Sequence, residues 1–429
     1  MQTKQKLLSA LILGAFASGA GASGFQLIEQ NASGLGNAYA GSAAVAENAS
    51  TIFYNPAGMT ELQGTQVSVG AALVKPSFKF KDEGSSTGAL ANGGNGGDAG
   101  RWGTVPNFYF STAASKDLSF GVGVGAPFGL MTKYDSSWSG AAQSVKFDVK
   151  TMNINPSVAY RINETISIGG GLNWQRLNAN YDRLAAVVAV GPFPASVTST
   201  TPVSLSVSDE STGWNVGALI KLSPATKLGL SYRSEIKYHA AGQVMVTGSS
   251  ALLNGARSSN VKADITLPDT FIASLTHQLD DRWNLLGDIS WTGWSSIPKI
   301  DIIRTSGSSS GLTAQTLNTD FRNTWRVAVG ANYKYSDSIK LKMGVAYDQT
   351  PVKGETTRMV SMPDNDRLWL SFGTQFQVSK DSAVDLGIAY LYVRDAKINN
   401  DQTADGRGTI TGTYKDSGLI LGAQYSAAF

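Results

Sequence analysis

Hydrophobic residues recur at every second position over most of the chain from about Gly64 onward. In "IKLKMGVAYD", residues 339–348, one face carries the Ile, Leu, Met, Val and Tyr side chains, and the other carries Lys, Gly, Ala and Asp. The segments "TKLGLSYRSE", "RVAVGANYKY" and "AVDLGIAYLYV" alternate in the same way. A period of two is typical of β-strands that have one face in apolar surroundings. We therefore predict an all-β fold.

The composition of the two faces indicates where the apolar face lies. A soluble β-sandwich shows the same alternation with its apolar side chains inward. Here the polar face is rich in Gly, Ala, Asn and charged residues, as in a water-filled lumen, and aromatic residues gather near strand ends, as at a membrane interface. Both features favour a transmembrane β-barrel whose apolar face contacts lipid.

Short and long connections alternate along the chain. The short ones are expected near residues 114, 162, 223, 279, 335 and 379. The long ones are expected over residues 75–102, 131–143, 184–211, 239–259, 299–318, 349–365 and 394–413. Outer-membrane barrels have short periplasmic turns, long outer loops and an even number of strands. The pattern therefore predicts fourteen antiparallel strands, with both ends of the barrel at the short-turn side.

The first 22 residues, "MQTKQKLLSALILGAFASGAGA", have the features of a secretory signal peptide. Two lysines precede an apolar stretch, and small residues follow it, so cleavage is expected just before Ser23. A membrane anchor is a poor alternative, because the apolar stretch has about 11 residues and a spanning helix needs about 20. We expect an exported protein located in the outer membrane.

Composition excludes several classes of function. The chain has no Cys and two His, so a thiolate or histidine-rich metal site is not expected, nor is a cofactor. A net charge of +3 does not suggest a nucleic-acid partner. Neither His belongs to a recognisable catalytic triad, and a set of charged residues near 348–367 is interpreted as ion pairs, because such clusters are commonly structural. We therefore expect no enzyme activity and no catalytic residue.

A fourteen-stranded barrel raises the question of what fills its bore. Eight strands fill their own interior, whereas sixteen or more leave a channel. Residues 23–62 are Gly-rich, nearly neutral and adjacent to the first strand, so we expect them to form a hatch inside a barrel of residues 63–429. Asn55 and Pro56 have the pattern of a helix N-cap followed by Pro at the first position. This start would either face a carboxylate or only turn the chain, and both interpretations remain open.

Two further irregularities interrupt the alternation. In "LSFGVGVGAPFGLMTKY", Pro127 cannot donate to a strand ladder, so it either opens the barrel wall or lies beyond the membrane. The expected outer loops around 184–197 and 244–256 are unusually apolar and would form either a ligand-binding groove or a self-packed lid. The groove would contain Val187, Val188, Phe193, Val244, Met245, Leu252 and Leu253. The last strand alternates up to Phe429, which resembles the signal read by the barrel-assembly machinery.

The chain resembles the long-chain fatty acid transporter family of Gram-negative outer-membrane β-barrels, which includes aromatic hydrocarbon transporters. The resemblance rests on "GFQLIEQNASGLGNAYAG" at the mature start, "NPA" at 55–57, "YRSE" at 232–235, "ITLPD" at 265–269, "WTGWS" at 291–295 and "TPVKGETTRMVSMPDNDRLWLSFG" at 350–373. It implies a monomeric barrel whose lumen is plugged by an N-terminal hatch and which is surrounded by outer-membrane lipid and lipopolysaccharide.

The resemblance also implies positions for a transport route. A hydrophobic small-molecule ligand, fatty acid or hydrocarbon, would enter an outer groove and then a lumen pocket that contains Phe25 and Arg183. The hatch gate would include Asn55, Pro56 and Ala57, and the ligand would leave sideways at a kink in strand 3 formed by Pro127, Phe128 and Gly129. The second pocket cation of the family, a lysine, has no clear match: Leu317 stands near its position, and Arg322, close by, is expected in the pocket with Phe25 and Arg183. The expected function is passive transport of long-chain fatty acids, with neutral hydrocarbons as the alternative and a general porin less favoured.

Overall fold

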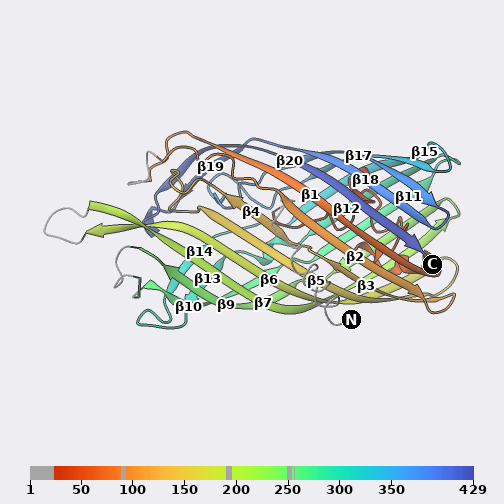
Figure 1. Cartoon of the computed structure of the whole chain (residues 1–429), viewed down its shortest axis with the longest axis horizontal. Helices are drawn as coiled ribbons and strands as arrows, with labels where there is room; N and C mark the ends of the chain where they lie inside the picture. The colour runs from red at the N-terminus through yellow and green to blue at the C-terminus, as the bar shows by residue number, and fades with distance from the viewer. Residues whose placement is uncertain (1–23, 88–92, 190–195, 249–253, 256) are drawn as a thin grey trace, which may run out of the picture.

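The computed structural model describes residues 24–87, 93–189, 196–248, 254–255 and 257–429, and the strands among them form a closed antiparallel barrel (Figure 1). The barrel has 14 strands. It closes where the first strand pairs with the last, from Gln66 opposite Ala428 to Asp82 opposite Gly412. The prediction of an all-β transmembrane barrel with fourteen strands is therefore confirmed.

Several strands carry two labels because a bulge, a bend or a short break interrupts them. The strands are β1 (Thr65–Asp82), β2 (Gly103–Ala113), β3 (Leu118–Gly125), β4 (Gly129–Lys133), β5 (Lys146–Arg161), β6 (Ile166–Ala189), β7 (Ser196–Ser223), β8 (Thr226–Arg233), β9 (Ile236–Val246), β10 (Ser259–Leu267), β11 (Thr270–Gln278), β12 (Trp283–Thr292), β13 (Ile300–Arg304), β14 (Thr313–Leu317), β15 (Thr324–Lys334), β16 (Ile339–Asp348), β17 (Arg367–Ser379), β18 (Ser382–Val393), β19 (Ala396–Asp401) and β20 (Thr409–Ala428). The helices are η1 (Leu35–Asn37), α2 (Thr51–Tyr54), η2 (Pro56–Glu61), η4 (Trp294–Ser296) and η5 (Thr403–Asp405). None of the helices in the described ranges is long and apolar enough to cross a membrane.

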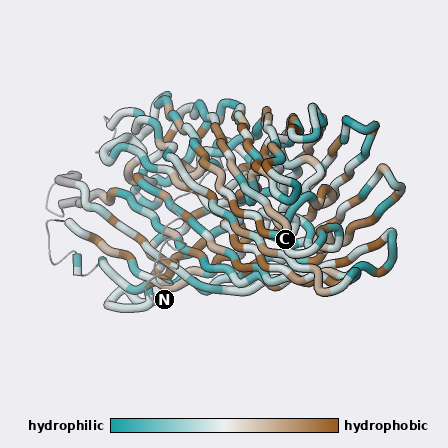
Figure 2. Tube along the Cα trace, turned by 45° about the vertical axis from the view of Figure 1, so that its right-hand side comes forward, coloured by the Kyte–Doolittle hydropathy of each residue, from teal (hydrophilic) through white to brown (hydrophobic). Residues whose placement is uncertain are grey.

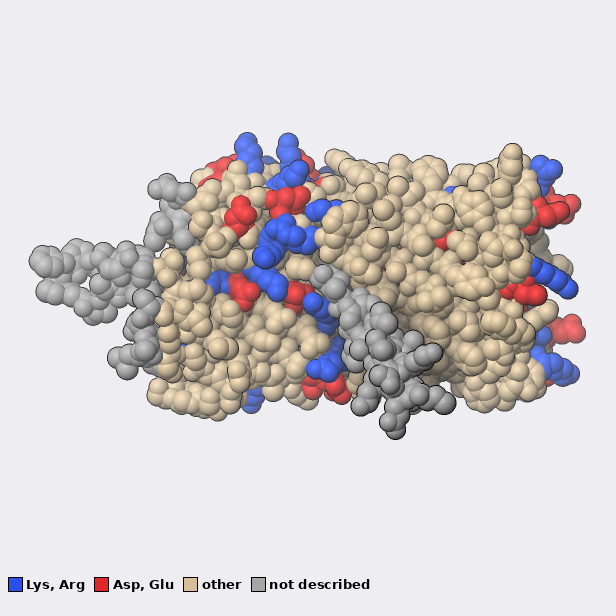
Figure 3. Space-filling view, viewed as in Figure 1, with Lys and Arg blue, Asp and Glu red and all other residues tan. Residues whose placement is uncertain are grey.

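The apolar face of the strands points outward. On β16, Met343, Val345 and Tyr347 are exposed, whereas Lys342 and Asp348 point inward and are buried. Figure 2 shows this alternation of hydrophobic and hydrophilic residues along the strands, and Figure 3 shows a broad surface without charged side chains between two charged ends. Lipid is the medium that makes this inverse arrangement stable, because each exposed apolar side chain would be unfavourable in water.

The six predicted short turns lie at one end of the barrel, but several of the predicted long loops contain paired strands, among them residues 299–318, where β13 pairs with β14, and residues 239–259, where β9 continues to Val246. Over residues 184–211, β6 continues to Ala189 and β7 starts at Ser196, so most of this segment is a paired hairpin. Over residues 394–413, β19 and β20 pair from Ala396 to Asp401. These strands extend beyond the lipid-facing part of the barrel. Their outward side chains are mostly polar there and are exposed to water.

The segment from Gly24 to Leu62 lies against the inner face of the barrel. The Asn37 amide donates to the Ala331 carbonyl at 3.1 Å, and the Asn55 amide donates to the Ala218 carbonyl at 2.9 Å. The inner wall has glycines at the contacts: a Cβ at Gly344 would collide with Asn37, one at Gly229 with Ala43, and one at Gly169 with Pro56 and Ala57. Small residues on the polar face of the strands thus make room for this segment.

Two carboxylates connect this segment to the wall by ion pairs. Glu47 lies 3.0 Å from Lys340 and 3.3 Å from Lys342, both on β16. Glu61 lies 2.9 Å from Lys221 on β7 and 3.0 Å from Lys227 on β8. The second half of the N-terminal segment is therefore attached to distant parts of the barrel.

Candidate functional site

A large cavity lies towards the long-loop end of the barrel and is lined by four arginines. It has a volume of about 660 Å³, and its guanidinium groups come from Arg183 on β6, Arg257 before β10, Arg304 at the end of β13, and Arg407 before β20. Asp405 is the carboxylate in its lining. We call this space the arginine cavity.

The four guanidinium groups are held mainly by uncharged partners. Arg183 Nε donates to Gln315 Oε1 at 3.1 Å, Arg304 to the Arg257 carbonyl at 2.5 Å, and Arg407 to Gln402 Oε1 at 3.1 Å. Among the described residues, none of the four forms an ion pair with a carboxylate. A cavity that collects positive charge without a matching negative charge is suited to an anionic group.

An apolar pocket of about 60 Å³ continues directly from the arginine cavity. The two spaces share Tyr181, Leu205 and Ile302 in their walls. The pocket is lined almost wholly by hydrophobic side chains from β5, β6, β7 and β10, with Phe25 at its inner end. Leu317, near the position where the resemblance places a lysine, lies in this apolar wall. Together the two spaces are charged at the outer end and apolar at the inner end.

Four aromatic rings pack together beside the apolar pocket, and two of them, Phe25 and Phe321, line it. The Phe25 ring lies 4.9 Å from that of Trp294 and 6.0 Å from that of Phe128, and Trp294 lies 5.8 Å from Phe321. Gly24 has φ +62°, and a Cβ there would collide with the Trp294 ring, so the chain turns into the pocket at a position that requires glycine. Trp294 was not predicted as a site residue, since only the fold brings η4 beside the N-terminal segment.

The third strand is broken at Ala126–Phe128, and the N-terminal segment occupies the break. The ladder between β2 and β3 ends at Phe108 opposite Val124, and β4 resumes at Gly129 on β5. The Leu27 amide donates to the Pro127 carbonyl at 2.7 Å, and the Gly129 amide donates to the Phe25 carbonyl at 2.8 Å. Backbone groups released from the wall thus pair with residues 25–27. We call residues 24–34 the N-terminal arm, and this arm covers the break.

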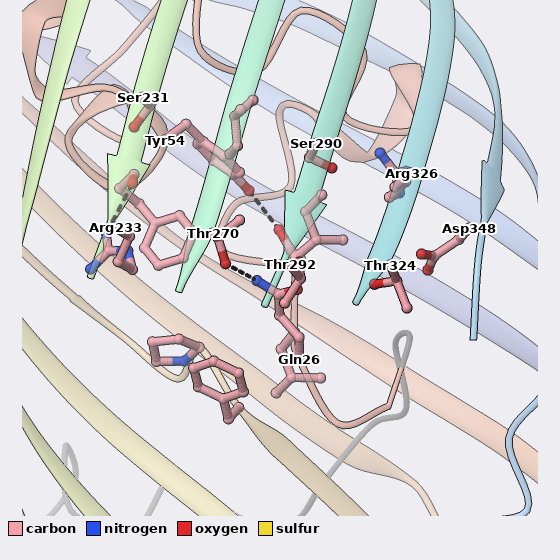
Figure 4. Close-up of a pocket in the computed structure, with 16 residues that line it drawn as sticks. Gln26, Tyr54, Ser231, Arg233, Thr270, Ser290, Thr292, Thr324, Arg326 and Asp348 are labelled. Carbon is pink, nitrogen blue, oxygen red and sulfur yellow. Dashed lines mark hydrogen bonds between the residues drawn. The ribbon is translucent and has the colours of Figure 1, made fainter. Parts of the chain in front are cut away.

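A smaller, more polar cavity of about 50 Å³ lies on the other side of Phe128 (Figure 4). The Gln26 amide donates to Thr270 Oγ1 at 3.0 Å and accepts from Thr292 Oγ1 at 3.0 Å, so both ends of this side chain are held. Ser231, Arg233, Arg326 and Asp348 complete its polar lining. Pro127 and Phe128 border this cavity, so the break in strand 3 lies where the apolar pocket meets a polar lumen.

The Asn-Pro-Ala motif forms a helix cap. Asn55 Oδ1 accepts from the Ala57 amide at 3.1 Å, and Pro56 is the first residue of η2. The Asn55 side-chain amide also donates to the Ala43 carbonyl at 2.7 Å. Because these groups already have partners inside the protein, the structure favours the turn interpretation over a carboxylate site at Asn55, Pro56 and Ala57.

Arg322 lies apart from the arginine cavity and the apolar pocket. Its Nε donates to the Thr350 carbonyl at 3.1 Å, and its guanidinium lies 3.8 Å from Asp366. The residue lines neither of the two spaces, so the predicted pairing of Arg322 with Arg183 and Phe25 is not what the structure shows. The cations that accompany Arg183 come from three other segments of the chain.

The predicted outer groove also needs correction. Val244 and Met245 are neighbours on β9, so they point to opposite faces: Val244 is buried in the arginine cavity wall, whereas Met245 is exposed. They cannot line one groove. Val187 and Val188 lie in the extended part of β6, at a bulge in its pairing with β7. Phe193, Leu252 and Leu253 lie outside the described residues, as does the predicted signal peptide.

The charged residues near 348–367 support the N-terminal arm. Arg367 and Asp364 form an ion pair, and Asp364 also accepts from the Gly24 amide at 2.9 Å and from Thr350 Oγ1 at 2.7 Å. Arg358 donates to the Asp364 carbonyl at 3.1 Å. The described residues contain no group of three or more acidic or His side chains placed to hold a metal ion. The cluster therefore fixes where the arm begins.

Glu29 is a fully buried carboxyl group in the same arm, and neither of its oxygens has a hydrogen-bond partner among the described residues. Burial raises its pKa to about 7; its own backbone amide, Arg367 and Arg326 oppose this rise, and the negative charge of Asp348 adds to it. Between about pH 4.5 and 7 the folded protein keeps a proton that the unfolded chain releases, so stability falls as pH rises through this range.

We expect Glu29→Gln to remove this pH dependence and to raise stability at pH 8 by on the order of 3 kcal/mol. Thermal unfolding of the purified wild type and variant from pH 4 to 8 measures both the pH dependence and the difference in stability. Glu47→Gln is the control with the opposite sign: burial opposes ionisation there, but Lys340 and Lys342 lower the pKa of Glu47, so its loss destabilises the protein near neutral pH. Equal pH slopes for wild type and Glu29→Gln would show that Glu29 does not titrate in this range.

Comparisons with known proteins agree with this geometry. A family model described as "Outer membrane protein transport protein (OMPP1/FadL/TodX)" matches residues 13–429. The chain is 28% identical to the long-chain fatty acid transport protein of Escherichia coli K12, over 96% of this chain and 97% of that protein. It is 30% identical to outer membrane protein P1 of Haemophilus influenzae Rd, over 90% of this chain and 89% of that one.

Solved structures show the same fold. A Pseudomonas aeruginosa FadL homologue superposes with a TM-score of 0.86 at 24% identity, covering 95% of this chain and 100% of that chain. The Pseudomonas putida toluene transporter TodX superposes with a TM-score of 0.68 at 16% identity, covering 93% and 98%. Proteins named for a fatty acid and for an aromatic hydrocarbon thus share this barrel.

Proposed function

We propose a ligand and a route from the premise that this chain belongs to the outer membrane transport protein family OMPP1/FadL/TodX. The protein is an outer-membrane β-barrel, and its relatives are transporters of hydrophobic molecules. Its ligand is an anionic amphiphile, with a long-chain fatty acid as the best candidate. The ligand crosses the outer leaflet passively and leaves through the wall of the barrel at strand 3.

The observation that carries this proposal is the joining of the arginine cavity to the apolar pocket. Arg183, Arg304 and Arg407 supply donors for a carboxylate, and the pocket that ends at Phe25 supplies apolar surface for the alkyl chain. A carboxylate gains most from charge-assisted hydrogen bonds, and each buried methylene contributes about 0.8 kcal/mol. The arrangement therefore fits both parts of a fatty acid.

The lateral exit at Pro127, Phe128 and Gly129 follows from the polarity of the lumen. Beyond this aromatic cluster, the cavity of Figure 4 contains hydroxyl, amide and charged groups among its apolar side chains, and an alkyl chain would have to desolvate these polar groups. The break in strand 3 offers an apolar way out into the membrane, once residues 25–27 move away from Pro127 and Gly129. The protein needs no energy source for this step, since the ligand moves down its concentration gradient.

The N-terminal segment acts as the hatch of this route. Residues 23–62 are proposed as one unit that plugs a barrel of residues 63–429. The ion pairs of Glu47 and Glu61 and the cap at Asn55 keep its second half attached to the wall. The arm before Leu35, by contrast, contacts the pocket and the broken strand. We therefore propose this arm, with Phe25 at its tip, as the moving part.

A neutral hydrocarbon is the second candidate. The inner pocket has an almost entirely hydrophobic lining, which would accept an aromatic molecule without using the arginines. A general porin is less favoured, because the N-terminal segment contacts the inner wall on several sides of the bore. Uptake of radiolabelled oleate and of radiolabelled toluene by cells that lack their own carrier separates these candidates; uptake of neither would remove both.

Straightening the third strand tests the lateral exit. Pro127→Val with Gly129→Val restores an amide donor and favours continuous pairing. We expect uptake to be lost while the amount of protein at the cell surface is unchanged. Gly287→Val with Thr374→Val, at outward positions on continuous strands, is the matched control. Full uptake through a wall shown crystallographically to be straight would contradict a lateral route.

Assembly partners are proposed from the chain end. Phe429 closes the barrel through backbone bonds with Thr65, at 2.8 and 3.3 Å, while its side chain is 82% exposed. An aromatic ring that is free while its backbone completes the ladder is available to the barrel-assembly machinery. We propose that the finished barrel works as a monomer within outer-membrane lipid.

A further inference from the structure

The outward face of the barrel changes from apolar to basic along a sharp line near its long-loop end. On β1, Val69 and Leu73 are exposed apolar residues, and Lys75, Lys79 and Lys81 follow on the same face. On β20, Leu421 and Leu419 are followed by Lys415. The strand register places these changes side by side, since Leu73 lies opposite Leu421 and Lys79 lies opposite Lys415. The line therefore runs across neighbouring strands.

Two pairs of lysines face each other directly across strands at this level. Lys79 on β1 is opposite Lys415 on β20, and Lys133 on β4 is opposite Lys146 on β5. Directly opposite side chains have Cβ atoms about 5 Å apart, and like charges at that separation destabilise a sheet. Lys146 has Asp148 at 3.4 Å, whereas the described residues give neither Lys79 nor Lys415 an ion pair. The β1–β20 pair thus carries a repulsion that no ion pair among the described residues offsets, although Asp98 is the bridge partner of Lys79 on its other side.

Among the described residues, the nearby carboxylates form no ion pair with Lys79 or Lys415. Asp98 is bonded to Ser77 Oγ, to the Phe78 amide and to the Gly100 amide, at 2.8 to 3.0 Å. Glu83 lies 3.5 Å from Lys81, and Asp148 lies between Lys146 and Lys150, 3.4 Å from each. Lys397 on β19 adds a further exposed cation beside Lys415, since it lies opposite Thr413 on β20. Figure 3 shows the result as a band rich in Lys and Arg beside the uncharged belt.

We infer that Lys79 and Lys415, with Lys133 and Lys146 beside them, bind the phosphate groups of lipopolysaccharide in the outer leaflet. The long loops place this end of the barrel outside the cell, where the outer leaflet carries a phosphorylated glycolipid. A phosphate with more than one negative charge bridges two ammonium groups that otherwise repel each other. Leu73, Leu419 and Leu421 lie just below, where the acyl chains of the same lipid would contact the barrel. The site is independent of the ligand route inside the barrel.

Binding of lipid A to the mature protein in detergent tests this site. We expect Lys79→Gln with Lys415→Gln to weaken binding of bis-phosphorylated lipid A about tenfold, measured by native mass spectrometry. Dephosphorylated lipid A should bind wild type and variant equally weakly. The control variant, Lys116→Gln with Lys380→Gln, removes the same charge from exposed turns at the other end and should bind lipid A as wild type does.

Thermal unfolding gives a second readout, because the variant is expected to differ from wild type in opposite directions without and with lipid A. Without lipid, the double variant should melt higher than wild type, because the repulsion between Lys79 and Lys415 is gone. With bis-phosphorylated lipid A, wild type should gain more stability than the variant. Equal lipid binding by the two proteins would overturn the proposal. So would equal stabilisation of wild type by inorganic phosphate alone, since that would indicate a simple anion site.

Discussion

Replacing Arg183 and Arg304 together by Gln is expected to weaken oleate binding about 100-fold and to leave toluene binding unchanged. Each guanidinium offers a charge-assisted hydrogen bond that Gln cannot supply, and such bonds contribute about 1.5–3 kcal/mol each. Toluene has no carboxylate, so it loses nothing. Equilibrium titration of the purified protein at pH 8, where the carboxylate is ionised, measures both affinities. Each single variant should weaken oleate binding roughly tenfold, because the two contributions to the binding free energy add.

The fold should tolerate this double change, because it removes repelling cations from one cavity and leaves Arg257 and Arg407 beside Asp405, the carboxylate in the lining. Lys237→Gln is the matched control: it removes one exposed cation from the outside of the barrel, where Lys237 lies 2.9 Å from Glu235. The methyl ester of oleic acid is the matched ligand, and it should bind all variants alike. If oleate binds the double variant as tightly as wild type, the arginine cavity is not the site of the head group, and the neutral hydrocarbon becomes the leading ligand.

A disulfide between residues 26 and 128 is expected to stop transport, and reduction is expected to restore it. Gln26 and Phe128 are antiparallel bridge partners, so cysteines there lie within the Cα separation that a disulfide spans. The chain has no cysteine of its own, so the new pair is the only thiol chemistry in the protein. A cross-link of this kind stabilises the closed arm by about 2–4 kcal/mol, which lowers the open population at least about 30-fold.

Fatty acid uptake by cells, before and after a membrane-permeant reductant, measures the effect. Gln26→Cys and Phe128→Cys alone show what is lost with each side chain, and only the oxidised double variant should respond to reduction. A second pair, placed at Leu35 and Gly387 beyond the arm, where a Cβ on Gly387 would lie 3.0 Å from that of Leu35, should leave uptake unchanged when oxidised. Transport that continues through the oxidised Gln26–Phe128 pair would show that the arm does not need to leave the broken strand.

The alternation of side chains was sufficient to predict the barrel and its lipid-facing surface. It is a local property: each residue of "IKLKMGVAYD" takes its face from its neighbours alone, and the short turns follow from polar residues between such runs. Arg183 keeps its inward orientation for the same local reason, because β6 stays in register with β7 until the bulge at Val187 and Val188. It failed for the ends of β6 and β7, where outward polar residues resembled a loop but remained paired in water.

The amino-acid sequence by itself therefore determined the strands, their inside and outside, the interruption at Pro127 and the small residues that make room within the bore. Only the tertiary structure decided which distant segments meet there. Arg257, Arg304 and Arg407 join Arg183, Trp294 joins Phe25 and Phe128, and Arg322 moves away to Asp366, because barrel closure and the path of residues 24–62 set these distances. The physical reason is that a face depends on the backbone period of two, whereas a cavity depends on contacts between residues far apart in the chain.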